Sequence, residues 1–273
     1  MNSVQSPNTL TAAPFGSTRG RVYVCAGCKE TFATYTEWCP KCNMDKGLFA
    51  QTGKFVRRRG FIRGSEHVPE FRETYDPGDW SPVFPEGVPG GTTILFRGLA
   101  GAGKTRLAMK LAVAIGTSVD GGSAAICSLE NPTDDVVRMA TGVGVDPEDI
   151  LISDAEWNET QLRQAANAGV RALVIDSIQK MGDRPNLYFE KLKEFTHGGQ
   201  GGRVLIAISQ SNARGGTRGG LSAEYDLAET VAVVTKTATP GIALITIEKN
   251  RYAPPGKFKA GLVSGAARLK RVK

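Results

Sequence analysis

The sequence predicts an α/β fold in which a mostly parallel sheet is flanked by helices, with a small metal-binding module near the N-terminus. Three observations lead to this prediction. A glycine-rich run stands between a strand pattern and a helix pattern, several apolar runs of strand length end in acidic or polar residues, and two Cys-x-x-Cys pairs lie within residues 21–45. The chain has 273 residues, 41% of them hydrophobic, which is enough for one full domain and a smaller module.

The glycine-rich run covers residues 98–105 and reads Gly-Leu-Ala-Gly-Ala-Gly-Lys-Thr. It follows the apolar stretch 92–96 and precedes a helix pattern over 106–115, which is the context that a phosphate-binding loop needs. The glycines let backbone N–H groups point at phosphate oxygens, Lys104 is expected to reach the β- and γ-phosphates, and Thr105 is expected to offer its hydroxyl to Mg²⁺. An incidental glycine-rich turn is the alternative. The expected contacts to the nucleotide come from Gly98, Leu99, Ala100, Gly101, Ala102, Gly103, Lys104, Thr105 and Arg106.

Three further strand-like runs end in side chains suited to nucleotide chemistry. Glu130 follows the first run and is placed to polarise the water that attacks the γ-phosphate, although an ordinary helix-capping acid is the alternative. Asp176 ends the second run and is expected to hold a water bound to Mg²⁺. Gln210 ends the third run and is expected to report the γ-phosphate state to the loop that follows it.

That loop, residues 211–221, contains four glycines and two arginines. A second glycine-rich stretch lies at 197–202. The two are predicted to project toward a shared axis, where the arginines can grip a phosphate backbone. Surface loops with incidental charge are the alternative.

Two cations, Lys249 and Arg251, follow the strand pattern at 242–247. Residues two apart on a strand extension point the same way, so a neighbouring subunit can supply both to the γ-phosphate. We therefore expect Lys249 and Arg251 to be catalytic, together with Glu130 and Lys104.

The formal net charge is +7, and its excess is N-terminal, because residues 1–75 hold 11 Lys/Arg and 6 Asp/Glu. The densest part, 54–63, mixes aromatic rings with cations, which suits contact with phosphates and stacking on bases. A solvated linker is the alternative. No apolar run approaches the roughly 20 residues of a membrane span, and the N-terminus lacks the features of a secretory signal. We expect a cytoplasmic protein without a membrane partner.

Four cysteines, Cys25, Cys28, Cys39 and Cys42, form two Cys-x-x-Cys pairs separated by ten residues. Four thiolates brought together by two tight turns suit a tetrahedral Zn²⁺ site, so the spacing predicts a small zinc ribbon. Because cysteines fill all four positions, a structural role is expected, and a redox pair is the alternative. The fifth cysteine, Cys127, falls in an apolar strand pattern and is expected to be a buried hydrophobe.

These patterns divide the chain into four parts. Residues 1–20 are expected to be disordered, 21–45 to form the zinc-finger module, 46–75 to be a basic linker, and 76–273 to form the nucleotide-binding domain. Within that domain, residues 268–273 have the composition of a basic tail.

The order of the motifs resembles the RadA/Sms family of bacterial DNA-repair ATPases. The resemblance runs from about residue 21 to about 262 and rests on the cysteine spacing, the run 98–105, Leu173-Val-Ile-Asp-Ser-Ile-Gln179 and Lys249-Asn-Arg251. It implies a RecA-like P-loop ATPase core that binds ATP and Mg²⁺, and a homo-hexameric ring with ATP at subunit interfaces. It also implies single-stranded or branched DNA in the channel, a recombinase or helicase partner, and a motor role in recombination and repair, by branch migration or DNA unwinding.

Three departures from the family pattern leave alternatives open. The chain stops where RadA proteins continue into a Lon-protease-like domain, Tyr-Ala follows Arg251 in place of Phe-Gly, and the stretches 128–131 and 208–210 look more like those of DnaB-type replicative helicases. A DnaB-like helicase-type ATPase is therefore one alternative. The others are a KaiC-like regulatory ATPase and an adaptor without motor activity.

Overall fold

The computed structural model describes residues 22–25, 31–32, 49–52, 72–153, 159–180, 192, 195–196, 202–211, 228–263 and 269–272. The chain divides into two compact units, Met1–Glu70 and Phe71–Lys273. The nucleotide-binding domain was predicted to begin at residue 76, a few residues after the start of the second unit.

Short antiparallel strands make up the described part of the first unit. They are arranged in the order β2-β1-β3 and are β1 (Val22–Cys25), β2 (Thr31–Phe32) and β3 (Phe49–Thr52). Strand β3 lies in the range expected to be linker. Cys25 ends β1 opposite Phe49, whereas Cys28, Cys39 and Cys42 lie outside the described residues.

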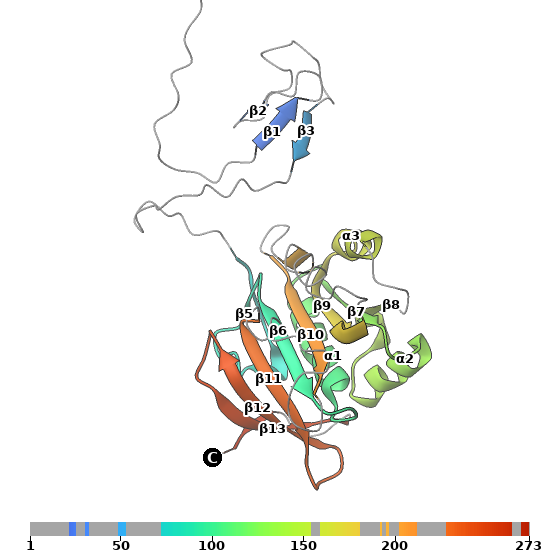
Figure 1. Cartoon of the computed structure of the whole chain (residues 1–273), viewed down its shortest axis with the longest axis vertical. Coiled ribbons are helices and arrows are strands. Elements are labelled where there is room, and N and C mark those ends of the chain that lie inside the picture. Colours follow the sequence, from blue (N-terminus) through green and yellow to red (C-terminus); the bar gives the residue numbers. More distant parts are fainter. Residues whose placement is uncertain are drawn as a thin grey trace, which may run out of the picture. The chain divides into compact units, whose positions relative to one another are not determined.

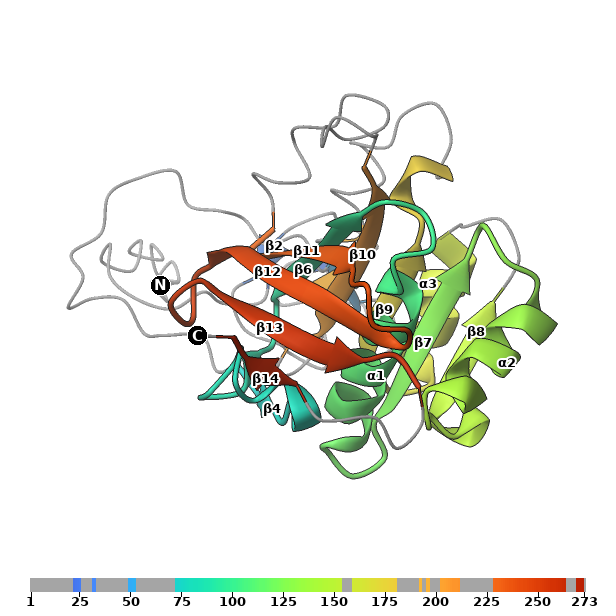
Figure 2. The same ribbon diagram turned by 90° about the horizontal axis from the view of Figure 1, so that it is seen from below.

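In the described part of the second unit, nine strands form one sheet in the order β14-β13-β12-β11-β6-β10-β9-β7-β8 (Figure 1). The strands from β11 to β8 run parallel to one another, and β12, β13 and β14 extend the sheet as an antiparallel ribbon at one end (Figure 2). The parallel strands are β6 (Thr93–Gly98), β7 (Ser123–Ser128), β8 (Ile150–Ser153), β9 (Val170–Asp176), β10 (Val204–Gln210) and β11 (Thr230–Lys236). The ribbon consists of β12 (Ile242–Asn250), β13 (Gly256–Gly261) and β14 (Lys270–Arg271).

Helices cover both faces of the parallel part, which explains why most residues of its strands are apolar and buried. On β6, Ile94 and Phe96 face one hydrophobic cluster and Leu95 faces the other. Helices α1 (Lys104–Thr117) and α2 (Thr133–Gly142) pack into the first cluster, and α3 (Glu159–Asn167) packs against the second. The expected α/β fold, a mostly parallel sheet flanked by helices, is therefore confirmed.

The remaining elements of the second unit are small. A two-stranded ribbon pairs β4 (Thr74–Tyr75) with β5 (Val88–Pro89), and the short 3-10 helix η2 (Gly78–Trp80) sets Trp80 edge-on against Phe96, with ring centroids 5.3 Å apart. Two further 3-10 turns are η3 (Pro147–Asp149) and η4 (Ile178–Lys180). None of the described helices combines the length and apolar character that crossing a membrane requires.

Two sequence expectations are settled by these elements. Cys127 is 5% exposed within the second cluster and is a free thiol, as expected; burial raises its pKa to about 11. The expectation of a basic tail at 268–273 was wrong for Lys270 and Arg271, which form β14 and pair with Lys259 and Phe258. The guanidinium of Arg271 lies 6.0 Å from the centre of the Phe258 ring, which gives this cation a packing role.

Candidate nucleotide-binding site

The register of three parallel strands gathers the polar residues at one edge of the sheet. Gln210 pairs with Gly98, Ile208 pairs with Asp176, and Asp176 pairs with Ser128. The carboxyl ends of β6, β10, β9 and β7 therefore meet, and ligands of open parallel sheets bind at such an edge.

The phosphate-loop residues link the end of β6 to the start of α1. Gly98 ends β6 with φ 148°, and a Cβ there would lie 2.2 Å from the carbonyl oxygen of Val234 on β11, so only glycine fits. Gly103 adopts φ 94° directly before Lys104, the first residue of α1. The loop can therefore present its N–H groups and the positive end of α1 to one anion.

The Lys104 side chain lies inside this loop. The residue is 6% exposed, and Nζ donates to the carbonyl oxygens of Gly98 and Leu99, each at 2.9 Å. Burial lowers the pKa of Lys104, while the charges of Asp176 and Glu130 act to raise it. A buried ammonium bonded only to carbonyls has a strong preference for an incoming anion.

Thr105 and Asp176 meet at the base of the loop. The Thr105 hydroxyl donates to Asp176 Oδ2 at 2.6 Å, and Asp176 is 2% exposed. Burial raises the pKa of Asp176, and Glu130 adds to this, while the Thr105 hydrogen bond and Lys104 oppose it. The Asp176–Ser177 peptide bond is cis.

These two oxygen donors fit Mg²⁺, which proteins usually hold through one or two side chains, with water and substrate phosphates completing the coordination. Within the described ranges, no group of three or more His, Cys, Asp or Glu residues is placed to hold a metal. This finding does not test the zinc prediction, because three of the four cysteines lie outside those ranges.

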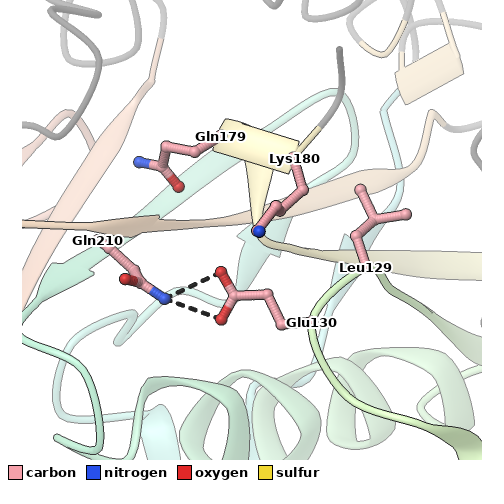
Figure 3. A pocket seen from close by; sticks show the side chains of 5 residues that line it. All are labelled: Leu129, Glu130, Gln179, Lys180 and Gln210. Carbon is pink, nitrogen blue, oxygen red and sulfur yellow. Dashed lines mark hydrogen bonds between the residues drawn. The ribbon is translucent and has the colours of Figure 1, made fainter.

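Glu130 lines a cavity of about 490 Å³ together with Leu129, Gln179, Lys180 and Gln210 (Figure 3). Gln210 Nε2 donates to both carboxylate oxygens of Glu130, at 2.9 and 2.8 Å, and the Ser177 hydroxyl donates to Oε1 at 2.5 Å. The carboxylate is thus held in place while its residue stays exposed toward the cavity.

The other loop residues that were predicted to contact the nucleotide differ in how exposed they are. Leu99, Ala100 and Gly101 are exposed, with Leu99 53% accessible, whereas Ala102 is buried and packs into the first cluster. Arg106 directs one guanidinium nitrogen to the Leu262 carbonyl oxygen, 3.4 Å away. Because its side chain is buried, Ala102 can contact a nucleotide only through its backbone, as the glycines of the loop do.

The two cations expected to act as fingers lie at the opposite edge of the sheet from the phosphate loop. Thr230 pairs with both Ile94, near the start of β6, and Asn250, at the end of β12. Lys249 and Arg251 flank Asn250, so they lie near the beginning of β6 and Gly98 lies at its end. The structure does not bring them together with Lys104 in one chain.

The segment that carries these cations is firmly anchored. Asn250 Nδ2 donates to the Val83 carbonyl oxygen at 3.0 Å, and its Oδ1 accepts from the Thr230 hydroxyl and from the Tyr252 N–H. The Tyr252 hydroxyl lies 2.9 Å from that of Thr92. Arg251 is exposed, and Lys249 is partly exposed.

The structure adds residues to the site that were not predicted to belong to it. Ser177 holds Glu130, Lys180 lines the cavity, and Gln179 donates to the Ser209 hydroxyl. All but Ser209 follow Asp176 within four residues, so their place directly after an acidic strand end was an available signal. Of the loop predicted at 211–221, residues 212–221 lie outside the described residues, and so do residues 197–201 of the stretch predicted at 197–202.

Comparison with known proteins supports the fold. A crystal structure with a similar fold is that of a KaiC-like protein from the hyperthermophilic archaeon Pyrococcus horikoshii, with a TM-score of 0.55 and 22% sequence identity over 75% of this chain and 100% of that one. No family model matches the sequence, and no curated protein does. The likeness agrees with the observed fold, a mostly parallel sheet flanked by helices.

Proposed function

We propose that this protein is an ATPase that couples hydrolysis of ATP to movement on, or remodelling of, single-stranded or branched DNA, in the manner of the RadA/Sms family. The observation that carries the proposal is the gathering of Lys104, Thr105, Asp176, Glu130 and Gln210 at the carboxyl edge of the sheet. A phosphate loop with an acid ready to activate water and a second acid beside its threonine suits hydrolysis of a nucleoside triphosphate.

Each residue has a distinct task in this proposal. Backbone N–H groups of 101–105 bind phosphate oxygens, and the Lys104 ammonium turns from the carbonyls of Gly98 and Leu99 to the β- and γ-phosphates. Thr105 and Asp176 would hold Mg²⁺, whose chemistry is to neutralise charge on the phosphates. Glu130 accepts a proton from the attacking water, and Ser177 keeps its carboxylate in place.

The proposal includes a homo-hexameric ring built from head-to-tail contacts. The phosphate loop lies at one edge of the sheet and the cations Lys249 and Arg251 lie at the other. A heterologous interface joins unlike surfaces and closes into a ring when the rotation permits. Such an interface would bring Arg251 of one subunit to the phosphates bound by the next, where an arginine finger is worth about 10³–10⁵ in rate.

The DNA-related part of the proposal rests on the sequence. The cations and aromatic residues of 54–63 and the arginines of 211–221 suit a phosphate backbone. The predicted zinc ribbon would add a contact to DNA or to a recombinase or helicase. A DnaB-like helicase would use the same residues, so the class of DNA substrate separates the two motor functions.

A regulatory ATPase is the second candidate, and the structural likeness to a KaiC-like protein favours it. It would use the same nucleotide site without moving on DNA. The adaptor alternative differs from both in needing hydrolysis only as a switch.

The deciding experiment measures ATP turnover with and without single-stranded DNA, for the wild type beside Lys104→Ala. The motor function requires hydrolysis that DNA stimulates and that the Lys104→Ala variant lacks. An ATP turnover rate that DNA does not change, together with no DNA binding at low salt, would support the regulatory ATPase. A motor should instead bind DNA strongly at low salt and lose affinity steeply as the salt concentration rises.

A further inference from the structure

Lys236 lies at the nucleotide edge of the sheet, although it is remote in sequence from the phosphate loop. It is the last residue of β11, which runs parallel to β6 and pairs Val233 with Arg97, the residue before Gly98. The turn that follows is well bonded, since Thr237 Oγ1 lies 3.0 Å from the Thr239 carbonyl oxygen and 2.9 Å from that of Ile242. The sheet and the turn together fix where the Lys236 side chain starts.

The end of that side chain lies against the middle of the phosphate loop. A Cβ added at Gly101 would lie 3.2 Å from Lys236 Nζ and 3.6 Å from Lys236 Cε. Gly101 has φ 68°, in the region that glycine favours. The missing side chain at 101 thus leaves the loop backbone open to the ammonium group.

The charge of Lys236 is unmatched at this place. Lys236 is exposed, and within the part of the chain that the structure describes its ammonium forms no hydrogen bond or ion pair. The loop already holds the ammonium of Lys104 and the positive end of α1. A second ammonium beside them raises the local positive potential, which a bound polyanion would offset.

We propose that Lys236 is a second lysine of the phosphate site, whose ammonium contacts the α- and β-phosphate oxygens of the bound nucleotide. Backbone N–H groups of a phosphate loop cradle the α- and β-phosphates, whereas its lysine, here Lys104, reaches toward the β- and γ-phosphates. Lys236 Nζ lies against Gly101 in the middle of that loop. The inference rests on the proposed function, because it assumes a nucleotide in this loop. It assigns a direct contact to a strand that the phosphate-loop pattern does not include.

The test compares Lys236→Gln with Lys236→Arg and with Lys259→Gln, in the full chain. Lys259 is an exposed lysine on β13, so its substitution removes the same charge from the same sheet. Affinities for ADP, ATP and AMP are measured by titration calorimetry at low and high salt, and melting without nucleotide checks that each variant folds.

We expect Lys236→Gln to weaken ADP and ATP by a similar factor of about ten, with a smaller effect on AMP. Lys236→Arg should keep most of the affinity, and Lys259→Gln should match the wild type. The wild type should also lose ADP affinity with salt more steeply than Lys236→Gln.

Unchanged ADP affinity in Lys236→Gln, a loss confined to ATP, or an equal loss in Lys259→Gln would overturn the inference. A wild type that binds neither ADP nor ATP would instead contradict the proposed function. The two failures are therefore distinguishable.

Discussion

One amide nitrogen of Gln210 holds both carboxylate oxygens of Glu130, at 2.9 Å from Oε1 and 2.8 Å from Oε2. The contact joins the end of β10 to the loop after β7, across the intervening strand β9. A bound nucleotide that draws Gln210 or Glu130 away from the other would break this contact between the two segments.

Replacing the carboxylate of Glu130 should slow hydrolysis strongly while keeping the nucleotide site. We expect Glu130→Gln to lower kcat by about 10²–10⁴-fold, the usual contribution of a general base, with ATP affinity close to that of the wild type. Single-turnover hydrolysis and ATP titration measure the two quantities. Glu148→Gln, at an exposed acid of η3, is the matched control and should hydrolyse ATP normally. An active Glu130→Gln variant would remove Glu130 from the base role.

The placement of Arg251 at the edge opposite to Lys104 predicts complementation between subunits. Arg251→Ala and Glu130→Gln should each be nearly inactive alone. An equimolar mixture should regain activity at about a quarter of the interfaces, namely those that join an intact Glu130 to an intact Arg251 of the next subunit. Turnover is measured after the mixed subunits have exchanged. A mixture no more active than its components would show that Arg251 does not act across an interface.

The part of the site that the sequence predicted follows from one rule, that parallel strands end at a common edge. Asp176 and Gln210 each ended an apolar run, and the structure places them on neighbouring strands. The position of Ser177 directly after Asp176 marked it as a candidate for the site, but its contact with Glu130 could not be predicted, because that contact depends on β7 and β9 being neighbours.

The place of Lys236 beside the phosphate loop was not predicted from the sequence, for a similar reason. Its relation to Gly101 arises only once β11 pairs with β6. The strand β13 was missed although Lys257, Phe258, Lys259 and Ala260 alternate, because the run is short and follows two prolines. The zinc cysteines and the loop at 211–221 stay predictions.

The cysteine spacing predicts one zinc ion per chain. Cys28→Ser should remove it, because three thiolates hold Zn²⁺ far less tightly than four. Cys127→Ala, at the buried free thiol of the core, should retain it. Elemental analysis of the purified proteins gives the metal content directly. Equal zinc in all three proteins would exclude the four-cysteine site.

Two glycines provide a matched test of the junction between β6 and β11. Gly98→Ala would place a Cβ 2.2 Å from the Val234 carbonyl oxygen, so we expect it to cost about 1–3 kcal/mol or more. Gly142→Ala, at the end of α2 with nothing within 4 Å, should stabilise the protein by about 0.4–1 kcal/mol. Thermal melting without nucleotide compares them. Equal melting temperatures for the two variants would contradict the observed packing of Gly98.

Tyr75 should make the protein sensitive to alkaline pH. Tyr75 is fully buried, and its hydroxyl lies 2.9 Å from Glu73 Oε2 and 2.7 Å from the Gly202 carbonyl oxygen. Burial raises its pKa to about 12 from 10.0, and Glu73 adds to the effect. Because the folded pKa is the higher one, the stabilisation is complete below pH 10 and is lost as the pH rises toward 12.

Tyr75→Phe isolates this contribution. At pH 8 the variant should be less stable than the wild type by about 1 kcal/mol, the usual value of a lost hydrogen bond. The gap should narrow or reverse by pH 11, because the tyrosine of the unfolded wild type ionises there and phenylalanine does not. Urea unfolding at the two pH values measures both differences. A gap that stays constant from pH 8 to pH 11 would mean that the Tyr75 hydroxyl ionises as easily in the folded protein as in the unfolded chain.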